Sequence, residues 1–197
     1  NRRLEVVLNL HSGEVAAALA LLADATDPSE RQLKAEILLA QGQLKEAEDC
    51  LSGLPATSET HRLMALIHLH RRRMSQAKIE IASAEGLAPE SHSVKLAKAI
   101  LLFYSALSPV VVPTRPLSRP QPVPFEFRLG TSEARQNLEE AARLLASLTP
   151  WGKSEAADFR CWRVACALLA DDEERARSIL DDGLKLDPAD DSLIQWA

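Results

Sequence analysis

Small and apolar residues recur along the chain in one fixed spacing. An alanine followed four residues later by leucine or isoleucine occurs as Ala18/Leu22, Ala47/Leu51, Ala77/Ile81, Ala141/Leu145 and Ala176/Leu180. Four residues make about one turn of an α-helix, so both members of each pair lie on one helix face. The first three alanines are 29 and 30 residues apart and the last two are 35 apart. The spacing predicts a repeated helical unit, with extra residues between the third and fourth copies.

The residues around each copy predict a helical hairpin. Twelve positions before the alanine, four copies carry a second small or β-branched residue, namely Val6, Ala35, Ala65 and Val164. A proline follows each copy, at Pro28, Pro55, Pro89, Pro150 and Pro188. Small side chains let two antiparallel helices approach closely, and a proline ends a helix because it lacks the backbone donor. We expect five hairpins, at residues 1–26, 28–55, 58–87, 91–148 and 153–187.

Short polar segments separate the two halves of these hairpins and predict tight turns. They are Ser12-Gly13, Gln41-Gly42, Arg71 to Arg73, and Ala170 to Asp172. Serine is a favoured N-cap because its hydroxyl accepts a hydrogen bond from an unpaired backbone N–H of the first helical turn. Four serines are therefore predicted N-caps, Ser29, Ser58, Ser91 and Ser132.

This arrangement resembles the tetratricopeptide repeat (TPR), a helical hairpin with a period of about 34 residues. The positions that carry the resemblance are Ala35, Gly42, Ala47 and Leu51, then Ala65, Ala77, Ile81 and Pro89, then Ala176, Leu180 and Pro188. The tryptophan, Leu-Gly and tyrosine of the family's first helix are missing here. The resemblance covers most of the chain outside residues 108–131. It implies one all-α domain over residues 1–197, a right-handed α-solenoid of about five hairpins.

Residues 108–131 interrupt the repeat inside the fourth hairpin. Six of the eleven prolines stand here, which excludes a helix and favours extended backbone. Three interpretations remain open: a linker without a partner, docking on the protein's own helices through Phe125 and Phe127, and display of a peptide ligand. For display, Pro113 and Pro116 form a P-x-x-P motif that suits an SH3-like groove, and the surroundings of Ser118 resemble a 14-3-3 site.

Composition narrows the class of function. Alanine and leucine dominate and aromatic residues make up 4% of the chain, which favours helices. No glycine-rich phosphate loop and no G-x-S-x-G nucleophile motif occurs in the sequence. The net charge of −5 argues against nucleic acid, because phosphate binding relies on a basic surface. We therefore expect no catalysis, no cofactor and no nucleic-acid partner.

The cysteines and histidines form no recognisable metal motif. Cys50, Cys161 and Cys166 contain no C-x-x-C pair, so we expect buried, reduced thiols and a cytoplasmic location. His68 and His70 are two residues apart and point in different directions on a helix, so no metal is expected there.

The remaining features concern partners and the extent of the chain. Arg71, Arg72 and Arg73 are expected to be a solvated charge run, with contact to an anion or an acidic peptide as the alternative. No apolar run is long enough to span a bilayer, so membrane insertion is not expected. The chain begins at Asn1 and stops within a helical pattern at Ala197, so we expect a piece of a longer protein.

The resemblance to TPR proteins implies a protein-interaction scaffold that binds a peptide or a partner protein in a concave groove. By the family's pattern, the groove-facing positions are Gln32, Glu36, Leu39, Ala40, Arg62, Leu66, Leu69, His70, Leu96, Ile100, Phe103 and Tyr104. Phe103 and Tyr104 either pack between hairpins or face the partner. Where some members clamp a C-terminal carboxylate, this chain has Val7, Leu63 and Leu66, so that specificity is not expected. The alternatives are a regulatory or targeting arm of a larger enzyme or assembly machine and, less favoured, an RNA-binding helical repeat.

Overall fold

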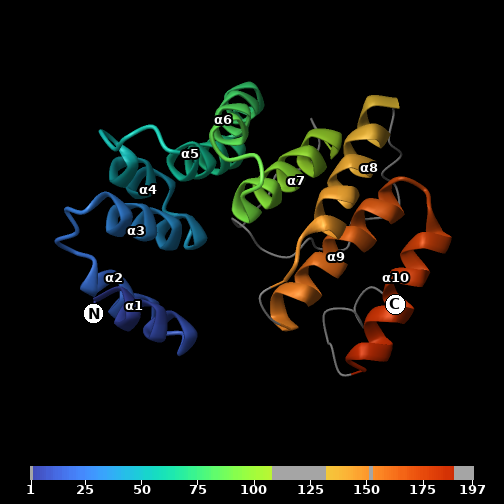
Figure 1. Ribbon diagram of the computed structural model, residues 1–197, viewed down its shortest axis with the longest axis horizontal. Coiled ribbons are helices and arrows are strands. Elements are labelled where there is room, and N and C mark those ends of the chain that lie inside the picture. The colour runs from blue at the N-terminus through green and yellow to red at the C-terminus, as the bar shows by residue number, and fades with distance from the viewer. Residues whose placement is uncertain (1, 108–131, 151–152, 189–197) are drawn as a thin grey trace. The chain divides into compact units, whose positions relative to one another are not determined.

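A computed structural model describes residues 2–107, 132–150 and 153–188 of the chain. Every regular element in these residues is an α-helix, and there are ten of them (Figure 1). They are α1 (Arg2–His11), α2 (Val15–Leu21), α3 (Pro28–Ala40), α4 (Leu44–Leu51), α5 (Ser58–His70), α6 (Met74–Leu87), α7 (His92–Leu107), α8 (Ser132–Ser147), α9 (Lys153–Leu169) and α10 (Glu173–Leu186). The predicted all-α class is confirmed.

The helices pair in chain order as hairpins. α1 packs on α2, α3 on α4, α5 on α6, α7 on α8 and α9 on α10. Each pair falls within one of the hairpins predicted from the alanine spacing, and residues 108–131 separate the helices of the fourth pair. A repeat-like helical architecture is therefore confirmed, whereas the handedness of a solenoid and the number of TPR units stay predictions.

The chain divides into two compact units, one containing α1 to α6 and the other α7 to α10. In the first unit each helix contacts the next along the chain, and α3 also contacts α5. In the second unit α8 contacts both α7 and α9, and α9 also contacts α10. Contacts between successive hairpins are typical of helical repeats, in which each hairpin buries the apolar face of its neighbour. The single domain over residues 1–197 stays a prediction.

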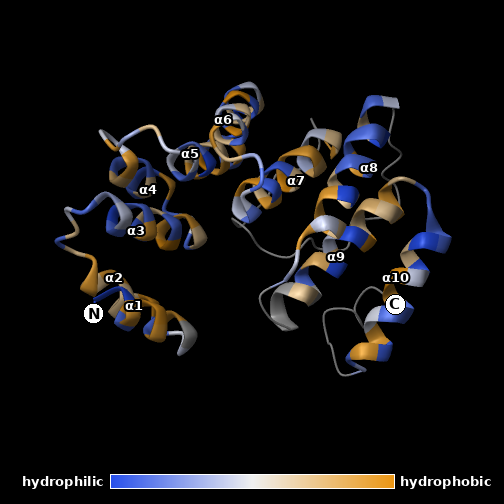
Figure 2. Cartoon of the chain, viewed as in Figure 1, coloured by the Kyte–Doolittle hydropathy of each residue, from blue (hydrophilic) through white to orange (hydrophobic). Residues whose placement is uncertain are grey.

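The recurring alanines lie in the core. Ala18, Ala47, Ala77 and Ala141 have no exposed surface, and Ala176 is 2% exposed. Their leucine and isoleucine partners are buried as well, and so are the small residues twelve positions earlier. Most helices carry both apolar and polar residues, as amphipathic helices do (Figure 2). The pattern read from the sequence therefore follows the buried faces of the helices.

One turn geometry recurs in four of the hairpins. A residue with positive φ follows the first helix, namely Gly13 (φ 77°), Gly42 (φ 77°), Arg72 (φ 60°) and Asp171 (φ 65°). The N–H of the residue after it donates to a carbonyl five positions earlier, at 2.8 or 2.9 Å in all four turns. This is the hydrogen-bond pattern of a Schellman C-cap, which glycine accommodates without strain. Arg72 and Asp171 adopt the same backbone at a cost.

The N-caps of α3 and α5 precede the residues predicted from the sequence. Asp27 accepts a hydrogen bond from the backbone N–H of Ser29 at 2.9 Å, and Thr57 holds the corresponding place before Ser58. The prediction of Ser29 and Ser58 as N-caps is therefore wrong. For α3 the reason is Pro28, which occupies the first helical position and leaves the residue before it to cap the helix.

Candidate functional site

The polar residues predicted for the groove contact one another in the first unit. Arg62 on α5 donates to Glu36 on α3 at 2.7 Å and pairs with Glu59 one turn earlier. Gln32 on α3 donates to the hydroxyl of Thr60 at 3.0 Å. These contacts join the first helices of two consecutive hairpins.

The Arg62 guanidinium is buried, since the residue is 5% exposed. Burial alone would lower the pKa of Arg62, but hydrogen bonds from it to Glu59 and Glu36 and their negative charges outweigh burial and raise the pKa. Its donors are directed at carboxylates of its own unit. Arg62 is therefore a contact between hairpins in this structure and not a side chain open to a partner.

The apolar groove candidates lie mostly in the core. Leu39, Leu66, Leu69, Ile100 and Phe103 are each at most 5% exposed. Their contact with a partner stays a prediction, but in this structure these side chains belong to the core. The physical reason is that these helices are covered by the second helix of their own hairpin and by a neighbouring helix, as α5 is by α6, α4 and α3. Among the other residues predicted to face the groove, Leu96 and His70 are half-buried and Ala40 is exposed.

Phe103 and Tyr104 form an aromatic cluster with Trp162 of α9. The ring centroid of Phe103 lies 4.9 Å from that of Trp162, and the two planes are nearly perpendicular. Tyr104 lies 6.0 Å from Trp162 in a similar edge-to-face arrangement. Burial raises the pKa of Tyr104 to about 12. Of the two possibilities left open by the sequence, packing between hairpins is the one observed. Trp162 was not identified from the sequence, although its helical spacing from Phe159 is typical of a core position.

The three consecutive arginines do not converge on one point. Arg71 donates to Glu48 of α4 at 2.6 Å. Arg72 occupies the positive-φ position of the turn, and Arg73 is exposed just before α6. The predicted insertion contacts Pro113, Pro116, Phe125 and Phe127 lie outside the described residues.

Burial is the main cause of the pKa shifts of two thiols and two histidines. It raises the pKa of Cys166 to about 12, raises that of Cys50, and lowers that of His70 to about 4. The pKa of His68 is lowered as well, again mainly by burial. All three cysteines are free thiols. Within the described part of the chain, no three His, Cys, Asp or Glu residues gather as a metal site would require.

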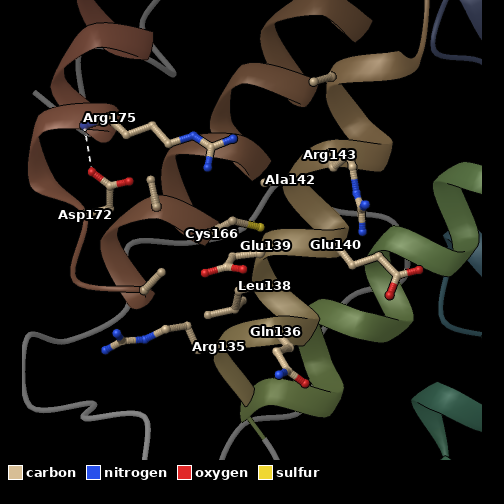
Figure 3. Close-up of a pocket in the computed structure, with 13 residues that line it drawn as sticks. Arg135, Gln136, Leu138, Glu139, Glu140, Ala142, Arg143, Cys166, Asp172 and Arg175 are labelled. Carbon is tan, nitrogen blue, oxygen red and sulfur yellow. Dashed lines mark hydrogen bonds between the residues drawn. The ribbon is translucent and has the colours of Figure 1, made fainter. Parts of the chain in front are cut away.

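An open hollow of about 840 Å³ lies in the second unit, with α8 on one side, the start of α10 on the other and α9 as its floor (Figure 3). Small side chains create the space, since Ala142 and Ala146 line it from α8, Ala167 from α9 and Ala170 from the turn after α9. This hollow was not predicted from the sequence. The available signal was alanines one turn apart on neighbouring helices, which leave room that larger side chains would fill.

Charged side chains enter the hollow from both sides. In Figure 3 Arg135 and Glu139 extend from α8 toward it, and Arg175 extends from α10 toward α9. Asp172 accepts a hydrogen bond from the backbone N–H of Arg175 at 3.1 Å and so caps α10. Glu140 forms an ion pair at 3.4 Å with Lys98 of α7.

Two half-buried arginines lie along α9 next to the floor. Arg163 is one helical turn from Arg160 on one side and from Cys166 and Ala167 on the other. The Nε of Arg163 is shielded from solvent and has no hydrogen-bond partner among the described residues. Burial lowers the pKa of Arg163, and the positive charges of Arg175 and Arg160 lower it further. The α9 side of the hollow is therefore locally positive in an acidic protein.

Comparison with known proteins gives no further assignment. Neither a protein-family model nor a curated protein nor a solved structure matches this chain. No helix in the described residues has the length and apolar character needed to cross a membrane. The function is therefore argued from the hairpins and from the hollow.

Proposed function

We propose that this chain is a protein-interaction scaffold whose TPR-like hairpins bind a peptide or a partner protein. The observation that carries the proposal is the open hollow of the second unit, which three successive helices line with both small and charged side chains. Helices hold such side chains at fixed positions, and rigid presentation lowers the entropy cost of binding an extended segment. A relationship to TPR proteins is part of the proposal. The buried alanines and the recurring turn support it.

Binding is favoured over catalysis by the chemistry of the hollow. Cys166 is the side chain in its lining that most resembles a nucleophile, and burial raises its pKa to about 12. A thiol with such a pKa carries almost no thiolate near neutral pH, so it is a poor nucleophile. The three free thiols also support a reducing compartment, and we place the protein in the cytoplasm on that ground.

Selection from a random peptide library displayed on phage tests the proposal without assuming a partner. We expect peptides that bind the folded chain to lose binding in Ala146→Trp, because the indole would fill the hollow from an exposed position on α8. The matched control is Ala82→Trp on α6, which introduces the same side chain at an exposed alanine of the first unit. Failure to enrich any peptide, or binding that Ala146→Trp does not weaken, would overturn the proposal.

A further inference from the structure

In the first unit, each buried or half-buried arginine donates a hydrogen bond to an acceptor within the same unit. Arg31 donates to the carbonyl of Ser52 at 2.8 Å, and Arg71 donates to Glu48 at 2.6 Å. The buried Arg62 pairs with two carboxylates. A guanidinium removed from water needs such partners, because desolvation of an unpaired charge is costly.

The half-buried arginines of the second unit have no such partner among the residues that the structure describes. Among the described residues, neither Arg160 nor Arg163 forms an ion pair or a side-chain hydrogen bond, although both are half-buried. Arg175 contributes a third positive charge from α10, close enough to lower the pKa of Arg163. Arg160, Arg163 and Arg175 are therefore three neighbouring cations for which the described residues supply no carboxylate partner, and Arg175 lines the hollow.

Of the three cations, Arg175 lines the hollow, whereas Arg163 and Arg160 continue along α9 from its floor. The floor residues Cys166 and Ala167 lie one turn from Arg163 on α9. Arg175 extends over the same helix from the opposite side of the hollow (Figure 3). The lining itself holds three arginines, Arg135, Arg143 and Arg175, and three acidic residues, Glu139, Glu140 and Asp172. The excess of positive charge therefore comes from Arg160 and Arg163 on α9.

We propose that the partner segment is an acidic peptide, and that Arg160, Arg163 and Arg175 bind its carboxylates. This inference rests on the proposed scaffold function and names the chemistry of its partner. Guanidinium groups match carboxylates in geometry and hold them by paired hydrogen bonds.

RNA is the other polyanion to consider, and the hollow favours it less. Its lining contains Glu139 and Asp172, which repel a continuous phosphate backbone. Its lining residues include no aromatic ring on which a base could stack. The chain as a whole carries a net charge of −5. A short acidic segment can place its carboxylates beside the arginines and avoid Glu139, Glu140 and Asp172.

Fluorescence anisotropy with three labelled probes tests the inference on the whole chain. The probes are a peptide of alternating glutamate and serine, the same peptide with glutamine in place of glutamate, and a single-stranded oligouridine. We expect the glutamate peptide to bind at least about tenfold more tightly than the glutamine peptide, which corresponds to one charge-assisted hydrogen bond. Its affinity should fall as salt is added.

Three variants locate the binding. Arg163→Gln and Arg175→Gln should each weaken binding of the glutamate peptide by about tenfold. Arg177→Gln is the matched control, because it removes the same charge from α10 on a surface shared with Glu174 and Asp181. It should leave the affinity within about twofold, as expected for a charge away from the contact.

Thermal unfolding separates a binding role from a structural one. We expect Arg163→Gln to keep or raise Tm, since it removes a half-buried charge that no described residue pairs with. A lowered Tm with unchanged affinity would assign Arg163 to the structure and overturn its role in binding. Arg175 is exposed, so Arg175→Gln tests the site even if Arg163→Gln does not fold.

The outcomes also distinguish the two proposals. Enriched phage peptides that are neutral or basic, and that Ala146→Trp blocks, would retain the scaffold and overturn the acidic partner. Equal affinity for the glutamate and glutamine peptides would likewise overturn the acidic partner and retain the scaffold. Preference for oligouridine over the glutamate peptide would overturn the acidic partner in favour of nucleic acid. If the library yields no binder and no probe binds, both proposals fail.

Discussion

The two units use their polar and apolar residues in different ways. In the first unit, polar side chains join helices, as Arg62 does through Glu36 and Glu59 and as His61 does through Glu80 at 2.6 Å. In the second unit, an ion pair between Lys98 and Glu140 joins α7 to α8, and the aromatic rings of Phe103, Tyr104 and Trp162 pack α7 against α9.

The difference bears on which surface is open for binding. Charges that hold helices together have their partners inside the unit and offer little to another molecule. Where apolar packing joins the helices, charges such as Arg163 and Arg175 remain unpaired by described residues and lie beside a hollow. The same hairpin can therefore serve mainly as structure in one unit and as a binding surface in the other.

The largest expected effect concerns the aromatic cluster. Trp162→Ala removes the ring that contacts both Phe103 and Tyr104, so we expect a loss of about 3–5 kcal/mol in the stability of the second unit. Urea unfolding gives the free energy, and hydrogen exchange should show the loss of protection in α7 and α9. Ile79→Ala is the control, because Ile79 is 65% exposed and its truncation should change stability by less than about 0.5 kcal/mol. A loss below about 1 kcal/mol for Trp162→Ala would contradict an aromatic core.

The next effect concerns the carboxylates around Arg62. Glu36→Ala combined with Glu59→Ala leaves a buried cation without compensation, and we expect a loss of about 2–3 kcal/mol in urea unfolding. Glu46→Ala is the control at an exposed glutamate of α4. The corresponding variant in the second unit is Arg163→Met, for which we expect no decrease in the free energy of unfolding. Equal losses in both experiments would remove the contrast between the units.

The sequence predicts the hairpins well because their signals are local. Ala47 and Leu51 lie on one face of one helix, and the turn at Gly42 follows within a few residues. Such signals give a wrong position where an adjacent residue has a stronger preference. At Ser29, Pro28 takes the first helical position, so Asp27 is the N-cap of α3.

The binding surface that we propose could not be derived in the same way. Whether the outer face of a first helix is open depends on the neighbouring hairpin, which buries Leu39 and Leu66 here. The hollow needs small residues on α8 and α9 together, and these become neighbours only when the hairpins pack. An alanine at one position, such as Ala146, is consistent with either a close helix contact or an empty space.

A third prediction uses pH to examine the polar interior of the first unit. Burial lowers the pKa of His70 to about 4, whereas an unfolded histidine titrates near 6.5. The unfolded chain therefore binds a proton first as pH falls, and stability should decrease between about pH 6.5 and 4. Because the side chain is partly exposed, we expect a loss of roughly 1–2 kcal/mol from this group.

In His70→Gln, the decrease in stability that His70 causes at low pH should be absent. Urea unfolding at a series of pH values measures this difference. An NMR titration of the His70 ring in the wild-type chain provides the direct reading. A midpoint close to 6.5 would show that the ring is hydrated in solution and would contradict the effect of burial.

The smallest effect concerns the turn that the two units share. Arg72 in the first unit and Asp171 in the second hold the positive-φ position that glycine holds at Gly13 and Gly42. A residue with a Cβ atom is strained there by about 1 kcal/mol, so Arg72→Gly and Asp171→Gly should each raise stability by up to that amount. Gly42→Ala should lower it by a similar amount. Its added methyl group would meet no atom within 4 Å, so the change isolates backbone strain from packing. Thermal unfolding measures all three variants. Gains of equal size at Arg72 and Asp171 would show that the turn belongs to the repeat itself, whereas a gain in one unit alone would extend the difference between the units to the backbone.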